Sequence, residues 1–89
     1  MYNNDVIDKI SITMQAINLM YSIMNKIKPS LAELEEINKR HELLIDQEKF
    51  WSKQDNPKRF LYDLQEFGHW LYEYLELKQY EDIDIDLWT

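Results

Sequence analysis

The sequence predicts an all-α fold, a three-helix antiparallel bundle, and three observations lead to it. The 89 residues include one glycine and two prolines, which leaves little material for β-turns. Apolar residues recur at helical spacing, and the breaks in this pattern coincide with Pro29 and Pro57. Hydrophobic residues make up 45% of the chain, enough for a packed core. The expected helices span residues 4–28, 31–53 and 57–79.

The first expected helix carries two apolar strips. One consists of Val6, Ile10, Met14, Ile17, Tyr21, Met24 and Ile27. The other, on roughly the opposite side, consists of Ile12, Ala16, Leu19 and Ile23. A helix that is apolar on two sides is normally central to its fold or buried in an oligomer. We therefore expect a homodimer with the second strip as the dimer interface; in the alternative, a monomer wraps its other helices around both sides.

The second and third expected helices begin at recognisable caps. Ser30 and Glu33 have the spacing of a capping box, in which each side chain bonds the other residue's backbone N–H. Asn56 is held out of the α region by Pro57 and suits an N-cap, and Pro57 suits the first helical position. The core face of the second helix is predicted as Leu34, Ile37, Leu44, Ile45 and Trp51. That of the third is predicted as Phe60, Leu61, Leu64, Phe67, Leu71, Tyr74 and Leu75.

An acidic, alternating tail of residues 81–89 follows the single helical domain of residues 1–80. In an extended chain its apolar and acidic side chains would lie on opposite sides. The two sets are Ile83, Ile85 and Leu87, and Asp82, Asp84 and Asp86. The tail is expected to stay disordered, to lie along the bundle, or to add to the sheet edge of a partner.

The net charge of −7 is concentrated near one end of the chain. Residues 1–29 carry +1, residues 30–60 carry −1 and residues 61–89 carry −7. This acidity argues against direct binding of nucleic acid or of an anionic membrane. Residues 10–25 are uncharged but too short and too polar for a membrane span, and no signal peptide is recognisable, so we expect a cytoplasmic protein.

No motif indicates catalysis, and we expect no enzyme activity, catalytic residue, metal or cofactor. The chain has no cysteine and no Gly-rich phosphate loop. Glu66 and His69 have the i, i+3 spacing of di-iron bundles, but such sites need a second pair and two further glutamates. His41 and Glu48 lie near the centre of the second helix's apolar stripe. They are expected to be a structural pair, with a pH-sensitive contact or a metal ligand as alternatives.

A stripe of acidic and aromatic side chains follows the outer side of the third expected helix. Its members are Tyr62, Glu66, His69, Glu73, Glu76 and Tyr80. We expect Trp70, Leu77 and Trp88 to be exposed beside it and the tail aspartates to extend it. An ordinary solvated face is the alternative. Carboxylates with interleaved aromatics suit docking on a basic protein surface, because the charges steer the encounter and the rings supply desolvated anchors.

These features predict a non-enzymatic binding protein that occupies a basic, nucleic-acid-binding surface of a partner protein. The predicted partner-binding residues are Tyr62, Glu66, His69, Trp70, Glu73, Glu76, Tyr80, Asp82, Asp84, Asp86 and Trp88. Immunity proteins, antitoxins and phage-encoded anti-defence inhibitors of the anti-CRISPR type include small acidic helical proteins of this kind. The alternative is a structural or assembly subunit that acts through self-association of the first helix, in which acidity serves only solubility.

Overall fold

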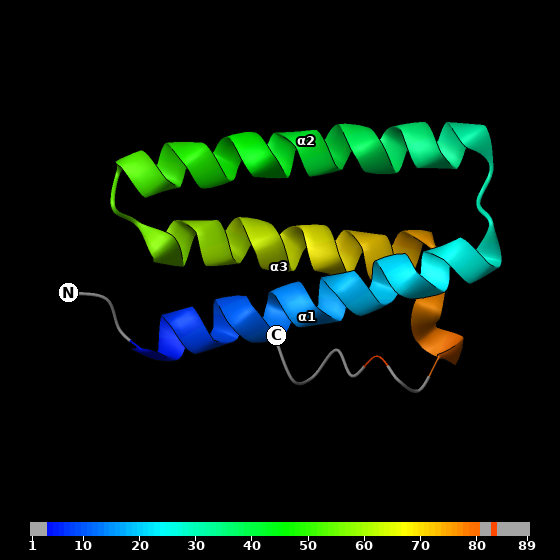
Figure 1. The fold of residues 1–89 in the computed structure, drawn as a ribbon, viewed down its shortest axis with the longest axis horizontal. Helices are drawn as coiled ribbons and strands as arrows, with labels where there is room; N and C mark the ends of the chain where they lie inside the picture. The colour runs from blue at the N-terminus through cyan, green and yellow to red at the C-terminus, as the bar shows by residue number, and fades with distance from the viewer. Residues whose placement is uncertain (1–3, 81–82, 84–89) are drawn as a thin grey trace.

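A computed structural model describes residues 4–80 and residue 83 of the chain. Three long helices follow one another in alternating directions, and a short 3₁₀ helix comes after them (Figure 1). No strand occurs among the described residues. The predicted all-α three-helix bundle is therefore confirmed. The elements are α1 (Asn4–Ile27), α2 (Leu31–Lys53), α3 (Pro57–Tyr74) and η1 (Leu77–Gln79).

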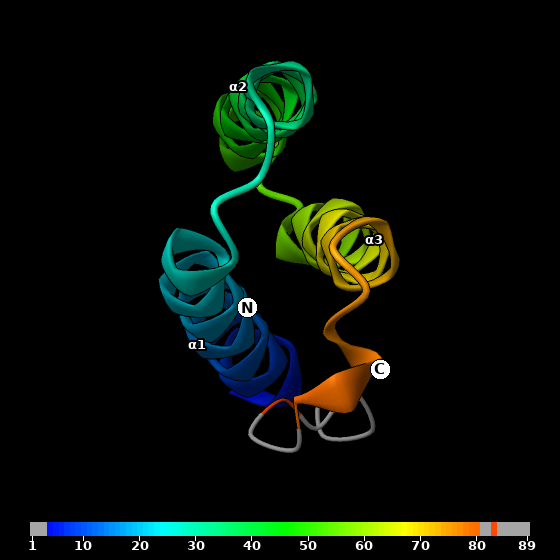
Figure 2. The same cartoon turned by 90° about the vertical axis from the view of Figure 1, so that its right-hand side faces the viewer.

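Helix α3 lies between the other two helices. Figure 1 shows α2 and α1 on either side of it, and the end view in Figure 2 shows that the three axes form an open V with α3 at its apex. The whole chain measures 41 × 26 × 15 Å. Helices α1 and α2 meet through Tyr21 and His41, whose ring centroids are 5.8 Å apart at an interplanar angle of 80°. Apart from this contact, the bundle is open on the side away from α3, as Figure 2 shows.

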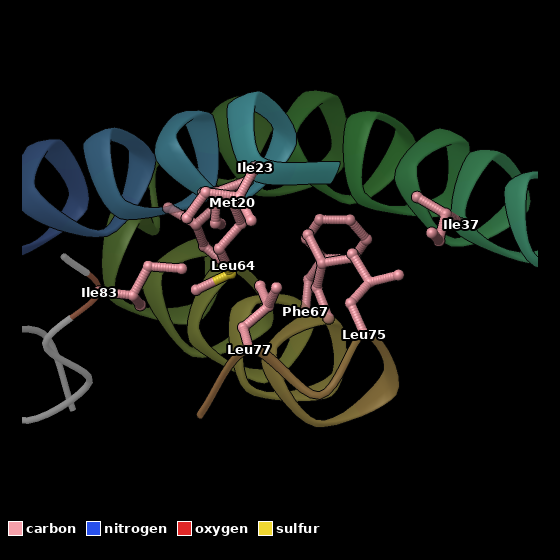
Figure 3. Close-up of a cluster of buried hydrophobic side chains, with 10 residues drawn as sticks. Met20, Ile23, Ile37, Leu64, Phe67, Leu75, Leu77 and Ile83 are labelled. Carbon is pink, nitrogen blue, oxygen red and sulfur yellow. The ribbon is translucent and has the colours of Figure 1, made fainter. Parts of the chain in front are cut away.

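The hydrophobic core lies between α3 and its two neighbours and continues beyond α3 (Figure 3). Leu77 and Ile83 are both buried in it, although they follow the last turn of α3. The predicted exposure of Leu77 is therefore wrong, because this side chain is fully buried. The buried cluster comprises Ile17, Met20, Ile23, Ile37, Leu64, Phe67, Leu71, Leu75, Leu77 and Ile83.

The buried face of α1 differs from the prediction. At 100° per residue the two apolar strips are centred about 130° apart, and Thr13 and Met20 fall midway between them. Both of these side chains are fully buried. The strips are therefore the two borders of one wide face, and the predicted position of the second strip opposite the first is wrong. Thr13 tolerates burial because its hydroxyl donates a hydrogen bond of 2.6 Å to the carbonyl oxygen of Lys9.

Helix α2 is less deeply buried than the prediction implies. Ile37 is its only buried residue, Leu34, Leu44 and Trp51 are half-buried, and Ile45 is 37% exposed. The physical reason is the open V, since α2 packs along α3 but meets α1 much less. The core assignment of Ile45 is therefore wrong.

The predicted helix starts are confirmed. The Ser30 backbone N–H donates to the Glu33 carboxylate at 2.9 Å, and the Glu33 backbone N–H donates to the Ser30 hydroxyl at 3.2 Å. The Asn56 side-chain oxygen accepts from the Arg59 backbone N–H at 3.4 Å, with Pro57 in the first turn.

The predicted end of the third helix at residue 79 is wrong. Helix α3 ends at Tyr74, and Glu76 then adopts the left-handed conformation with φ 53° and ψ 47°. This turn redirects the chain, so that Leu77 enters the core instead of continuing along α3.

Each long helix is followed by a residue other than glycine in the left-handed region. These residues are Lys28, Asp55 and Glu76, with φ between 53° and 56°. For a residue with a Cβ this conformation costs about 1 kcal/mol, whereas glycine adopts it freely. We expect Lys28→Gly and Glu76→Gly each to raise the free energy of unfolding by about 0.5–1 kcal/mol in urea denaturation. Lys39→Gly, in the interior of α2, is the control and should cost about 1 kcal/mol; losses at all three positions would contradict the prediction.

The capping box makes stability depend on pH. Hydrogen bonds from the Ser30 backbone N–H and then from its hydroxyl lower the pKa of Glu33 below the ordinary value of 4.5. A carboxylate with a lowered pKa in the folded state adds stability above its unfolded pKa and loses it as pH falls through the folded pKa. Thermal unfolding should therefore show wild type more stable than Glu33→Gln at about pH 7, with the difference disappearing below about pH 3. A difference that persists in acid would refute the prediction.

Candidate functional site

The outer side of α3 presents four of the predicted partner-binding residues together. Tyr62, Glu66, His69 and Glu73 are all exposed and recur three to four residues apart. Leu64 points into the core, and Glu66 follows it by two residues, or 200° around the helix. The stripe therefore faces away from the core. Its carboxylates, phenol and imidazole can bind cationic groups and hydrogen-bond donors.

The stripe is shorter than predicted because α3 ends before its last two members. Glu76 is exposed but lies on the left-handed turn after the helix. Tyr80 follows η1, is half-buried and packs against the core. Neither residue continues the line of side chains on α3. The structure thus brings together Tyr62, Glu66, His69 and Glu73 and separates Glu76 and Tyr80 from them.

Trp70 lies at the seam between α2 and α3 and is half-buried. The Arg40 guanidinium carbon lies 4.2 Å from the centroid of the Trp70 ring, and Tyr74 stacks on the same ring at 4.6 Å with an interplanar angle of 20°. The Trp70 ring is thus in contact with side chains of both helices. Arg40 Nε also donates a hydrogen bond of 3.1 Å to the Glu36 carboxylate on the same helix. These contacts give Trp70 a structural role at the seam between α2 and α3.

A hollow of about 270 Å³ between α2 and α3 borders the acidic stripe. Leu43 on one wall is 55% exposed, Phe67 is buried beneath, and the carboxylates of Asp63 and Glu66 lie on the α3 wall. The hollow combines an apolar floor with carboxylates on the α3 wall, and Arg40 lies on the α2 wall. Sequence reasoning missed Leu43 because it lies off the apolar face of α2. Its lining consists of Arg40, Leu43, Leu44, Gln47, Asp63, Glu66 and Phe67.

A hydrogen bond fixes the Asp63 carboxylate at the edge of this hollow. The indole N–H of Trp51 donates to Asp63 Oδ2 at 2.8 Å. The guanidinium carbon of Arg59 lies 5.3 Å from the centroid of the Trp51 ring, and Phe50 meets this ring edge-on at 4.6 Å. The orientation of the Asp63 carboxylate is thus fixed by a side chain of α2. The sequence contains no signal for this pair, since its two members belong to different helices.

His41 lies inside the open V. Its ring contacts Tyr21 and also Phe67, whose centroid is 6.1 Å away, so that His41 packs between α1 and α3. Burial raises the pKa of the Tyr21 phenol above its ordinary value of 10.0. Glu48 is exposed, and both His41 and Glu48 line a groove between α1 and α2. Within residues 4–80 and 83, no cluster of three His, Asp or Glu side chains is arranged to hold a metal ion.

The remaining predicted residues fall into two groups. Four of the partner-binding residues lie outside the described part of the chain, namely Asp82, Asp84, Asp86 and Trp88. Of the predicted dimer interface, Ile23 is buried in the monomer core and Ala16 is half-buried against it. Ile12 and Leu19 are 40% and 37% exposed at the border of that core. Ile12 and Leu19 are thus the most accessible members of this strip, and the predicted interface stays a prediction.

Comparison with known proteins gives no match to a family profile, to a curated protein or to a solved structure. In the described residues, no helix has a stretch both long and apolar enough to cross a membrane.

The hydrogen bond between Trp51 and Asp63 should contribute measurably to stability. Trp51→Phe keeps an aromatic ring but removes the indole donor, and it leaves the half-buried carboxylate without this bond. We expect the free energy of unfolding to fall by about 1–2 kcal/mol in urea denaturation. Phe50→Leu, at the neighbouring exposed ring, is the control and should cost less than about 0.5 kcal/mol. Equal losses in both variants would show that the hydrogen bond adds nothing.

Proposed function

We propose that this protein is a non-enzymatic binding protein whose acidic face occupies a basic, nucleic-acid-binding surface of a partner protein. It would act as an inhibitor, in the manner of an immunity protein, an antitoxin or a phage-encoded anti-defence protein. The observation that carries the proposal is the joining of two features on one side of the molecule. These are the exposed stripe on α3 and the adjacent hollow between α2 and α3.

The carboxylates of the acidic face would steer the encounter with the partner and fix how the two proteins align. Glu66 and Glu73 are seven residues apart, so they lie about 10 Å apart along the axis of α3. Asp63 adds a third negative charge, which Trp51 holds in a fixed orientation. Carboxylates in such a row can occupy the positions of phosphates on a basic surface, and complementary charge accelerates the encounter.

The hollow supplies the apolar part of the contact. Leu43 is more than half exposed beside the Asp63 and Glu66 carboxylates. An apolar side chain of the partner, or the stem of an arginine or lysine, can lie on Leu43 while a cationic head meets a carboxylate. Interfaces gain most of their affinity from a few desolvated anchors of this kind, surrounded by polar groups.

Charge reversal on α3 tests the proposal. A tagged chain would be used to capture the partner from the native host, and the purified partner's binding to labelled DNA and RNA would be measured with and without the protein. We expect the protein to displace nucleic acid. We expect Glu66→Lys with Glu73→Lys to weaken the captured complex at least about tenfold, with an effect that shrinks as salt is added.

The matched control is Glu42→Lys with Asp46→Lys on the exposed side of α2. Both double variants change the net charge of −7 by the same amount, so they differ only in where the charge lies. Equal weakening by the two pairs would refute a local acidic site. A partner whose nucleic-acid binding is unchanged by the protein would refute inhibition by mimicry.

A further inference from the structure

A second surface lies on the opposite side of α3, where the V between α1 and α2 is open. A groove of about 110 Å³ runs there, with Phe60 and Leu64 of α3 as its floor. Met14 forms part of the α1 wall and is 47% exposed, and Ile45 forms part of the α2 wall. Leu64 and Glu66 lie 200° apart around α3, so the groove and the acidic stripe face in opposite directions.

The exposed ridge of α1 beside this groove has the spacing of a helix-packing seam. Ile7, Ser11, Met14 and Asn18 follow one another at i, i+4, i+7 and i+11, and all four are exposed. This alternation of three and four residues places side chains in line for packing against another helix. Ile7 and Met14 supply apolar area, while Ser11 and Asn18 supply uncharged hydrogen-bonding groups. Charged residues, which would have to be desolvated, are absent from the ridge.

The charge distribution along the chain indicates which kind of partner fits the ridge and the groove. Residues 10–25 contain no charged side chain, although 30% of the chain is charged. Residues 1–29 together carry +1, and the excess negative charge belongs to residues 61–89. Two copies of an acidic protein repel each other wherever their acidic parts approach. They can meet along the uncharged stretch of α1, where that repulsion is weakest, and Glu48 is the one carboxylate among the residues that line the groove.

We propose that the groove between α1 and α2 receives the α1 ridge of a second copy of this chain, in a reciprocal antiparallel dimer. In this arrangement Met14 of each copy enters the groove of the other and contacts Ile45 there. The contact is isologous, since each copy offers both a ridge and a groove. It differs from the strip at Ile12 and Leu19, which lies on the other border of the α1 core face.

The exposure of large apolar side chains on both walls of the groove agrees with this proposal. Met14 on the α1 wall is 47% exposed and Ile45 on the α2 wall is 37% exposed. A second α1 in the groove would close the V.

Analytical ultracentrifugation of the full chain tests the dimer. At about 100 µM we expect a species of twice 11.0 kDa. Met14→Glu should stay folded, as judged by circular dichroism, because residue 14 is half exposed, and it should weaken the dimer roughly 100-fold. Ile12→Glu is the control, since it places the same charge at a similarly exposed position on the other border of α1, and it should leave the dimer intact.

Mixing complementary variants tests the contact itself. Met14→Lys and Ile45→Glu should each be monomeric alone and should form a heterodimer when mixed. In that heterodimer the introduced ammonium of one chain would face the introduced carboxylate of the other, while the second contact stays Met14 with Ile45. Three results would overturn the proposal. They are a wild type that remains at 11.0 kDa at every concentration, equal weakening by Met14→Glu and Ile12→Glu, or no rescue on mixing although each variant is folded.

Discussion

The apolar face of α3 holds the bundle together because both of the other helices share it. Leu64, Phe67 and Leu71 pack in one cluster with Met20 of α1 and Ile37 of α2 (Figure 3). Helices α1 and α2 meet each other far less than they meet α3, as the end view shows. This arrangement leaves two surfaces free, the outer side of α3 and the groove between α1 and α2. The candidate sites lie on these two surfaces for that reason.

Local signals made the helix starts predictable. The hydrogen bonds of a capping box depend only on residues three apart, so Ser30 and Glu33 could be identified from spacing alone. The end of α3 could not be predicted, because the chain turns at Glu76, where glycine or asparagine would normally give the signal. The burial of Thr13 was not predicted either. A polar side chain can be buried in a core face only when it is hydrogen-bonded, and the bond from the Thr13 hydroxyl to the Lys9 carbonyl oxygen forms only in the folded helix.

The candidate site was predictable where it follows one helix and unpredictable where it depends on two. Tyr62 and Glu73 share a face because of the period of α3 alone. The covering of Trp70 by Arg40, and the fixing of Asp63 by Trp51, depend on the rotation of α2 relative to α3. Helical periodicity within one segment contains no information about that rotation. Leu43 became part of the site for the same reason, as the wall that faces Asp63 and Glu66 across the seam.

The position of α3 also determines how the molecule can come apart. Helix α2 can separate from α3 while α1, α3 and the segment at Leu77 and Ile83 remain packed, since only Ile37 of α2 is buried. Helix α1 contributes Ile17, Met20 and Ile23 to the common cluster, so it cannot separate from α3 without opening most of that cluster. The backbone amides of α3 would therefore exchange with solvent only when the whole domain unfolds, whereas those of α2 can exchange through a smaller opening. The helix expected to be least protected, α2, is thus the one that forms a wall both of the hollow between α2 and α3 and of the groove between α1 and α2.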